Sequence, residues 1–155
     1  MQAVDLSTHP GHLARRLQQA HHLLWNTMVS QETTSPQFAV LNALTAEPGL
    51  DQRTVGERVG LDRSTVAEVI TRLLRRELLD KVRDPHDGRR FLLRLTDEGA
   101  RTHRLLALRT VGMNQVFLGP LSPDERQTLF DLMRRAADAA EAFRLPEEAG
   151  PPAGR

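Results

Sequence analysis

The sequence predicts a mainly α-helical chain that contains one short β-hairpin. Apolar side chains recur every three or four residues over most of its 155 residues, which is the spacing of amphipathic helices. Hydrophobic residues make up 39% of the chain and aromatic residues only 4%, a composition better suited to packed helices than to a sheet sandwich. Turn residues between two short extended runs, 81–83 and 91–95, predict the hairpin. We expect one domain with helical extensions.

Two helices are predicted before the central region. The first spans about residues 11–29 and carries one continuous apolar stripe, formed by Leu13, Leu17, Ala20, Leu24 and Met28. The second begins with Ser35 as N-cap and Pro36 at the first helical position, and it ends at residues 47–49, Glu-Pro-Gly. Residues 1–10 are expected to form a loose arm.

A pair of short helices follows. Asp51 opens the first helix and Gly60 closes it, while Asp62 is placed to cap the second. The second helix buries an apolar stripe at helical spacing, formed by Val66, Ile70, Leu73 and Leu74. Two helices joined by a short glycine-containing turn predict a helix-turn-helix.

The hairpin comes directly after this pair. Residues 84–90, Asp-Pro-His-Asp-Gly-Arg-Arg, provide turn chemistry between the two extended runs and place two arginines at the tip. A hairpin in this position would be called a wing, so the sequence predicts a winged helix-turn-helix.

Two longer helices complete the chain. Thr96 caps the first, with Asp97 and Glu98 in its first turn, and the helix runs to Gly119-Pro120 with apolar residues on more than one face. The last helix begins at Ser122-Pro123. Residues 145–155 are rich in proline, glycine and alanine and are expected to be disordered. The apolar surface of the terminal helices exceeds what a monomer of this size can cover, which predicts a homodimer.

Three segments together resemble the multiple antibiotic resistance regulator (MarR) family of bacterial winged-helix transcription factors. They are the helix LDRSTVAEVITRLLRRELL, the wing DPHDGRR and the closing LLRLTDEG. The resemblance implies a DNA-binding module over residues 35–96 and a helical dimerisation region over residues 10–34 and 97–144. It also implies a repressor of transcription that binds double-stranded DNA at an inverted-repeat, palindromic operator, with a recognition helix in each major groove.

Side chains on the predicted recognition helix are assigned DNA contacts by their chemistry. Arg63 can present a bidentate fork to guanine, and Ser64 and Thr65 can donate to a phosphate or a base edge. Glu68 either accepts from a cytosine amino group or orients Arg72. Phosphate contacts are expected from Arg72, Arg75, Gln52 and Thr54.

The wing supplies a second set of DNA contacts. Arg89 matches the family's minor-groove arginine, and Asp87 is placed to hold it through a hydrogen-bonded ion pair. Arg90 and His86 are supporting candidates. A solvated surface charge remains the alternative for each of these residues singly.

The resemblance also implies an effector site between the first helix, the second helix and the long helix after the wing. Its candidate residues are His12, Arg15, Arg16, Trp25, Met28, Phe38, Arg109 and Met113. Aromatic rings beside arginine or histidine suit a small aromatic acid. The segments HLARRLQQAHHLLW and TSPQFAVLNAL resemble the subgroup that controls catabolism of nicotinate-type and hydroxycinnamate-type acids.

Each effector-site assignment has an alternative. Trp25 can belong to the dimer core, and Arg15 and Arg16 can pair with carboxylates of a partner chain. A metal site built from His9, His12 and a partner group is also open. At the level of function, the alternatives are a ligand-independent or metal-responsive DNA-binding module, or a winged helix used for protein contact.

Composition excludes several other classes. The chain contains no cysteine, so disulfides, thiolate metal sites and thiol redox sensing are excluded. Its net charge is only +1, but residues 62–95 carry nine basic against six acidic side chains, whereas residues 122–155 carry five against seven. No phosphate-binding glycine loop or catalytic motif occurs, so neither an enzyme nor a cofactor is expected. The absence of both an apolar run of about 18 residues and a cleavable hydrophobic leader predicts a cytoplasmic protein with no membrane contact.

Overall fold

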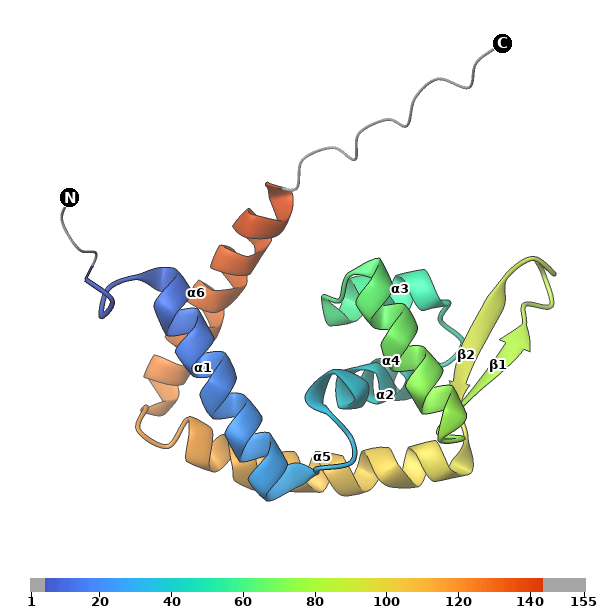
Figure 1. The fold of residues 1–155 in the computed structure, drawn as a ribbon, viewed down its shortest axis with the longest axis horizontal. Coiled ribbons are helices and arrows are strands. Elements are labelled where there is room, and N and C mark those ends of the chain that lie inside the picture. Colours follow the sequence, from blue (N-terminus) through green and yellow to red (C-terminus); the bar gives the residue numbers. More distant parts are fainter. Residues whose placement is uncertain (1–4, 144–155) are drawn as a thin grey trace, which may run out of the picture. The chain divides into compact units, whose positions relative to one another are not determined.

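A computed structural model describes residues 5–143 in two units, one within residues 1–117 and the other within residues 118–155. The first unit contains the predicted helix-turn-helix and wing and the helices around them (Figure 1). Its elements are α1 (Pro10–Leu24), the π-helical turn η1 (Trp25–Val29), α2 (Ser35–Ala46), α3 (Gln52–Val59), α4 (Arg63–Arg75), β1 (Leu79–Arg83), β2 (Phe91–Leu95) and α5 (Asp97–Phe117). The second contains α6 (Pro123–Ala142). The mainly helical fold with one hairpin is confirmed.

The first predicted helix is divided into α1 and η1. Its start was predicted one residue late, because Pro10 occupies the first turn and the His9 side chain accepts from the backbone N–H of His12 at 3.2 Å. The loose arm therefore ends before His9, and residues 1–4 lie outside the described part. At the other end the helix widens to a π turn, in which the N–H of Ser30 donates to the carbonyl of Trp25 at 3.0 Å.

The cap of α2 differs from the prediction by one residue. Thr34, not Ser35, is the N-cap: its hydroxyl accepts from the N–H of Gln37, and the Gln37 side chain accepts from the N–H of Thr34. This reciprocal capping box satisfies two amides at once, which a cap at Ser35 with Phe38 three residues later would not do.

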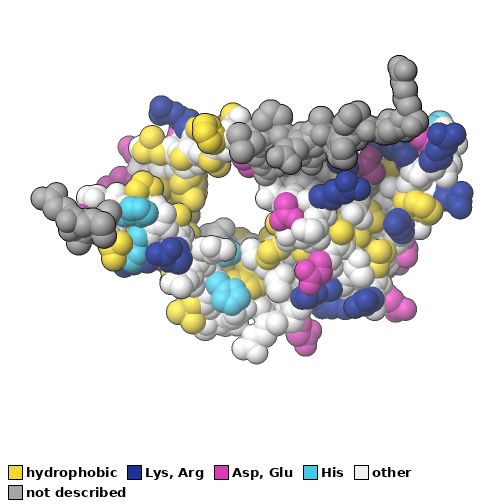
Figure 2. All heavy atoms as spheres, turned by 45° about the horizontal axis from the view of Figure 1, so that its top comes forward, with side chains coloured by type: hydrophobic (Ala, Val, Ile, Leu, Met, Phe, Trp, Pro, Cys, Tyr) yellow, Lys and Arg dark blue, Asp and Glu magenta, His cyan; other side chains and the backbone are white. Residues whose placement is uncertain are grey.

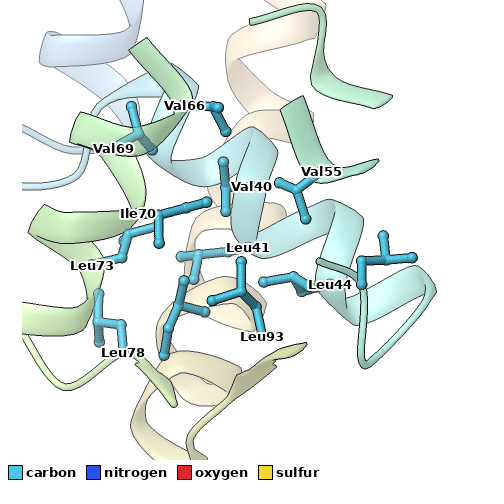
Figure 3. Packing of buried hydrophobic residues seen from close by; sticks show 12 residues of the cluster. Val40, Leu41, Leu44, Val55, Val66, Val69, Ile70, Leu73, Leu78 and Leu93 are labelled. Atoms are coloured by element: carbon cyan, nitrogen blue, oxygen red, sulfur yellow. The ribbon is translucent and has the colours of Figure 1, made fainter. Parts of the chain in front are cut away.

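The helix-turn-helix forms as predicted. Asp51 caps α3, Gly60 closes it in the left-handed conformation, and Asp62 caps α4. The predicted stripe of α4 is confirmed at three positions and corrected at the fourth, because Val69 is buried and Leu74 is only partly buried. These side chains point into one core between α2, α3, α4 and the wing (Figure 3). Its residues are Val40, Leu41, Leu44, Leu50, Val55, Val66, Val69, Ile70, Leu73, Leu78, Leu79 and Leu93.

The wing is a two-stranded antiparallel hairpin. β1 begins two residues earlier than predicted, because Leu79 pairs with Leu95 and the register continues to Arg83 opposite Phe91. Leu50 forms an additional bridge with Leu93. The N–H of Leu93 donates to the carbonyl of Leu50 at 2.9 Å. The wing is therefore attached to the loop before α3 as well as to α4.

The long helix α5 connects the wing to the rest of the first unit. Thr96 caps it as predicted, its hydroxyl accepting from the N–H of Gly99 at 2.9 Å. The helix ends at Phe117, two residues before the predicted glycine. A second core cluster, made by Trp25, Val29, Leu106 and Met113, packs α5 against η1.

The second unit is built around α6. Ser122 caps it with Glu125 in a capping box, which confirms the predicted start. No residue of α6 is buried within the described part of the chain, and its exposed apolar side chains include Phe130, Leu132 and Met133. The predicted disordered tail, residues 145–155, lies outside the described residues. None of the helices between residues 5 and 143 is both long and apolar enough to cross a membrane.

Candidate DNA interface and effector region

The outward face of α4 carries the predicted base-reading residues. Arg63, Ser64, Glu68, Arg72 and Arg75 are all exposed, and Thr65 is half-buried. The opposite face of the same helix is buried in the core, so the exposed side chains are fixed in direction by packing. This arrangement is what a recognition helix requires, because the base-reading side chains must be held in one register.

The N-terminus of α4 is held by a dense cap. The Asp62 carboxylate accepts from the backbone N–H groups of Ser64 and Thr65 at 3.0 and 2.9 Å, and from both of their hydroxyls at 2.6 Å. These four donors stabilise the charged carboxylate, so the pKa of Asp62 is well below its ordinary value. Both hydroxyls therefore donate to Asp62 in this structure. Each would have to rotate away from Asp62 to donate a hydrogen bond to DNA.

Further along α4, Glu68 and Arg72 form an ion pair one helical turn apart. This contact favours the second of the two roles predicted for Glu68, orienting Arg72, over direct reading of a cytosine. Arg75 is exposed at the end of the same helix. On α3, Gln52 and Thr54 are half-buried, and the N–H of Thr54 donates to the Asp51 carboxylate at 2.8 Å.

The wing tip differs from the prediction in its contacts. Asp87 does not pair with the Arg89 guanidinium; its carboxylate accepts from the backbone N–H of Arg89 at 3.0 Å, because the tight turn brings that amide close. The Arg89 and His86 side chains are exposed. Arg83 also braces the tip by donating to the carbonyl of Gly88 at 3.2 Å.

Arg90 instead connects the wing to the helix-turn-helix. Its guanidinium pairs with the Asp51 carboxylate, which caps α3. The hydrogen bond from Thr54 and the contact with Arg90 together lower the pKa of Asp51 to about 2, so this carboxylate stays charged at neutral pH. Arg90 thus positions the wing relative to α3, a role that the sequence analysis did not find.

Basic side chains are interspersed with acidic ones on the face over α3, α4 and the wing (Figure 2). Several of the acidic groups are already paired with arginines, as in the Arg53–Glu57, Arg58–Glu47 and Arg72–Glu68 pairs. Arg63 and Arg89 stand apart from the side-chain ion pairs found between residues 5 and 143. Arg75 is likewise exposed and absent from these ion pairs, so these three arginines can offer their charge to a phosphate or a base.

Aromatic and histidine rings gather where η1, α2 and α5 meet. The Trp25 ring lies 5.5 Å from Phe38 and 6.1 Å from His21, and Phe38 stacks on His103 at 5.5 Å. Trp25 is only 3% exposed, and its indole N–H donates to the carbonyl of Thr33 at 2.7 Å. Trp25 is therefore a core residue of its own chain, in addition to being a predicted effector contact.

His103 joins this aromatic group to the DNA-binding module. Its Nε2 lies 3.0 Å from the side-chain oxygen of Asn42 on α2. Burial lowers the pKa of His103 from its ordinary value of 6.5, and the charge of Arg104 lowers it further. The ring is therefore neutral at physiological pH and donates Nε2–H to Asn42.

This pKa shift predicts a loss of stability in mild acid. Because the folded-state pKa of His103 lies below its unfolded value, the unfolded chain takes up the proton first. The stabilising effect is complete above about pH 6.5 and is lost as pH falls through the folded-state pKa. The free energy of unfolding, measured in urea, should therefore fall more between pH 7.5 and pH 5 for the parent than for His103→Gln, whose side chain does not titrate. Equal losses would contradict the prediction.

A pocket of about 600 Å³ lies next to this aromatic group, between the loop after η1, the end of α4 and α5. Its size falls in the range of small-molecule sites, roughly 300–1,000 Å³. Both guanidinium and carboxylate groups reach it, among apolar side chains of α5. Its wall contains Ser30, Gln31, Glu32, Thr33, Arg76, Leu78, Glu98, Thr102, Leu105, Leu106 and Arg109.

The predicted effector residues are only partly brought together. Trp25, Phe38 and Met113 share one cluster, whereas Arg109 lines the pocket and donates to the carbonyl of Val29 at 2.8 Å. The others lie on or just after α1: Arg15, Arg16 and Met28 are exposed, and His12 is half-buried. Within residues 5–143, no three His, Cys, Asp or Glu side chains come close enough to hold a metal ion.

An exposed, firmly capped recognition helix beside a basic wing defines the class of winged helix-turn-helix DNA-binding proteins. A model described as MarR family matches residues 32–90. The transcriptional regulator HosA of Escherichia coli O111:H- is 33% identical over 83% of this chain and 94% of its own length. The chain belongs to the MarR family and is a winged-helix transcriptional regulator.

Two solved structures extend this comparison. The PcaV transcriptional regulator of Streptomyces coelicolor, crystallised with its natural ligand, is 78% identical, with a TM-score of 0.88 over 90% of this chain and 99% of that one. Bordetella bronchiseptica BpsR, whose DNA binding is regulated by 6-hydroxynicotinic acid, is 32% identical, with a TM-score of 0.74 over 82% and 97% of the two chains.

Proposed function

We propose that this regulator is a homodimeric repressor that binds an inverted-repeat operator and is released from it by a small aromatic acid. The observation that carries the DNA-binding part is the outward row of α4, whose direction is set by the buried opposite face and by the Asp62 cap. Arg63 would read guanine, and Arg89 of the wing would enter the minor groove. Such a regulator acts on DNA in the cytoplasm and needs neither catalysis nor a cofactor.

Dimerisation is supported by the apolar side chains that remain exposed on the terminal helices. α1 exposes Leu13, Leu17 and Leu23, and the apolar residues of α6 have no buried neighbour within the described part of their unit. On α5, the exposed apolar residues are Leu105, Leu108, Val111 and Val116. Surface of this kind marks a protein interface, and a second copy of the chain is the simplest partner.

A dimer with two-fold symmetry predicts a two-fold symmetric contact with DNA. We expect light scattering to find two chains per operator duplex. Footprinting of the intergenic region beside the gene should show two protected half-sites about one helical turn apart. A single protected half-site bound by one chain would contradict the proposal, and a reporter assay decides whether occupation represses or activates.

An aromatic acid as effector is supported by the aromatic group around Trp25 and by the likeness to BpsR, which responds to such an acid. The ring would lie against Trp25 and Phe38, and the carboxylate would pair with Arg15, Arg16 or Arg109. His12, Met28 and Met113 complete the proposed set. Ligand binding would change the distance between the two recognition helices, so that both no longer fit their half-sites.

Trp25→Phe tests this position with least damage to the fold. Alanine at this buried site would cost about 3–5 kcal/mol of stability, whereas phenylalanine keeps most of the ring. We expect Trp25→Phe to bind operator like the parent but to need about tenfold more acid for release, since ring area is lost. An unchanged release midpoint, with thermal unfolding as the control for folding, would place the effector elsewhere.

A further inference from the structure

The end of the recognition helix is hydrogen-bonded to a loop far away in the sequence. Arg76 follows the last residue of α4, and its Nη1 donates to the carbonyl of Glu32 and to the hydroxyl of Thr33, each at 3.1 Å. These bonds cross 44 and 43 residues of sequence. Arg76 therefore fastens the recognition helix to the loop between η1 and α2.

The same loop is fastened on its other side to the aromatic group. The carbonyl of Thr33 accepts from the Trp25 indole N–H at 2.7 Å, and Thr33 itself is buried. Two local bonds stiffen the segment between them, because the Ser30 hydroxyl accepts from the N–H groups of Glu32 and Thr33 at 3.1 and 2.9 Å. Thr33 thus contacts Trp25 through its carbonyl and Arg76 through its hydroxyl.

A third anchor leaves the loop little freedom to absorb a movement. Arg109 of α5 donates to the carbonyl of Val29, which is itself buried in the cluster with Trp25. With its carbonyls at 29, 32 and 33 all accepting side-chain donors, the loop cannot shift at one end without straining a bond at the other.

We infer that Arg76 is a positioning residue that couples the recognition helix to the environment of Trp25 through Thr33. The inference rests on the proposed function. It adds the route by which the effector region and the DNA-binding surface influence each other. Coupling between two binding events is reciprocal. A change at α4 on binding DNA must therefore also change the environment of Trp25. Occupation of the effector region would change DNA affinity by the same route in reverse.

The chain provides its own probe, since Trp25 is its only tryptophan. We expect its fluorescence emission to change as unlabelled operator DNA is added, along the same curve as the anisotropy of labelled operator. In Arg76→Ala, operator should still bind within about threefold of the parent, but the emission change should fall by about threefold or more. Arg76→Lys retains one donor, so it should recover part of the emission change. Thr33→Val should lose part of the emission change.

Arg104→Ala is the matched control, because Arg104 is exposed on α5 and lies outside this set of bonds. It should give the emission change of the parent. An Arg76→Ala variant that binds operator with the full emission change would overturn the inference, as would a parent whose emission does not respond to bound operator.

The proposed function and the role of Arg76 can be tested separately. If the parent does not bind operator at all, the proposed function is wrong, and hydrogen exchange of the free protein then decides the inference. In that measurement Arg76→Ala must raise exchange in residues 30–33 and also in the turn 25–29, while Arg104→Ala leaves both unchanged. Faster exchange confined to residues 76–78 would show that Arg76 does not reach Trp25.

Discussion

Replacing Gly99 by alanine is expected to lower the free energy of unfolding by about 3 kcal/mol or more. A Cβ atom at this position would lie 2.0 Å from the carbonyl oxygen of Leu78 and 3.0 Å from its carbonyl carbon. Both are backbone atoms, and the same carbonyl accepts from the N–H of Thr96. The first turn of α5 would have to move away from the base of the wing, so DNA binding should weaken as well.

The same helix offers a control for this substitution. Gly112 lies on α5 with no neighbouring atom within 4 Å of a Cβ built on it. Gly112→Ala should therefore raise stability by about 0.5–1 kcal/mol through helix propensity alone. Urea unfolding followed by circular dichroism measures both variants. A Gly99→Ala protein about as stable as the parent would show that α5 does not approach Leu78 as closely as described.

Replacing Arg63 by alanine is expected to cost roughly 1–3 kcal/mol in operator binding and to relax the base preference at one position of each half-site. Arg63 stands at the exposed start of α4, and the Asp62 cap holds the backbone there in one conformation. Titrating a set of operators substituted at each position, at fixed salt, measures the effect. Equal discrimination by variant and parent would remove the base-reading role from Arg63.

Arg89→Ala is the informative comparison. Arg89 lies at the wing tip, where a phosphate or minor-groove contact carries little base information. Its loss should weaken binding to every duplex and lower the salt slope by about one. The two arginines are therefore expected to separate specificity from general affinity, with Arg104→Ala as the neutral surface control.

Local signals in the sequence predicted the module well. Asp51, Gly60 and Asp62 each act on the backbone within three residues, so a cap or a left-handed turn is readable from the residue type alone. The cap of α2 shows the limit of such reading. Thr34 and Ser35 are both good caps, and only Gln37 three residues after Thr34 distinguishes them. That signal was present in the sequence and was missed.

Contacts between distant residues were not predictable in the same way. The Arg90–Asp51 pair and the Arg76–Thr33 bond cross 39 and 43 residues, and nothing in the local pattern selects one carboxylate or hydroxyl among many. The predicted Asp87–Arg89 pair was wrong for a related reason, since the turn geometry brought a backbone amide closer than the guanidinium. Gly99 was part of the motif that indicated the family, but its packing against Leu78 required the structure.

The sequence predicted several residues of the effector region but not their arrangement in space. Trp25, Phe38 and Met113 do share one cluster, because each lies on the apolar face of its own helix. Sequence periodicity does not tell whether such a face is filled by its own chain or open to a ligand. It also gave no indication of the pocket beside Arg109 and Arg76, whose wall comes from three separate segments.

Fluorescence anisotropy of labelled intergenic DNA measures whether this protein binds DNA and whether an aromatic acid releases it. The titration is repeated with a panel of aromatic acids that includes 6-hydroxynicotinic acid, and with zinc in the presence and absence of chelator. We expect tight, salt-dependent binding to an inverted repeat that one aromatic acid reverses and zinc does not. Binding that only zinc or chelator alters, or that no aromatic acid disturbs, would contradict the proposed effector. Absence of binding would contradict the proposed recognition of this DNA as operator.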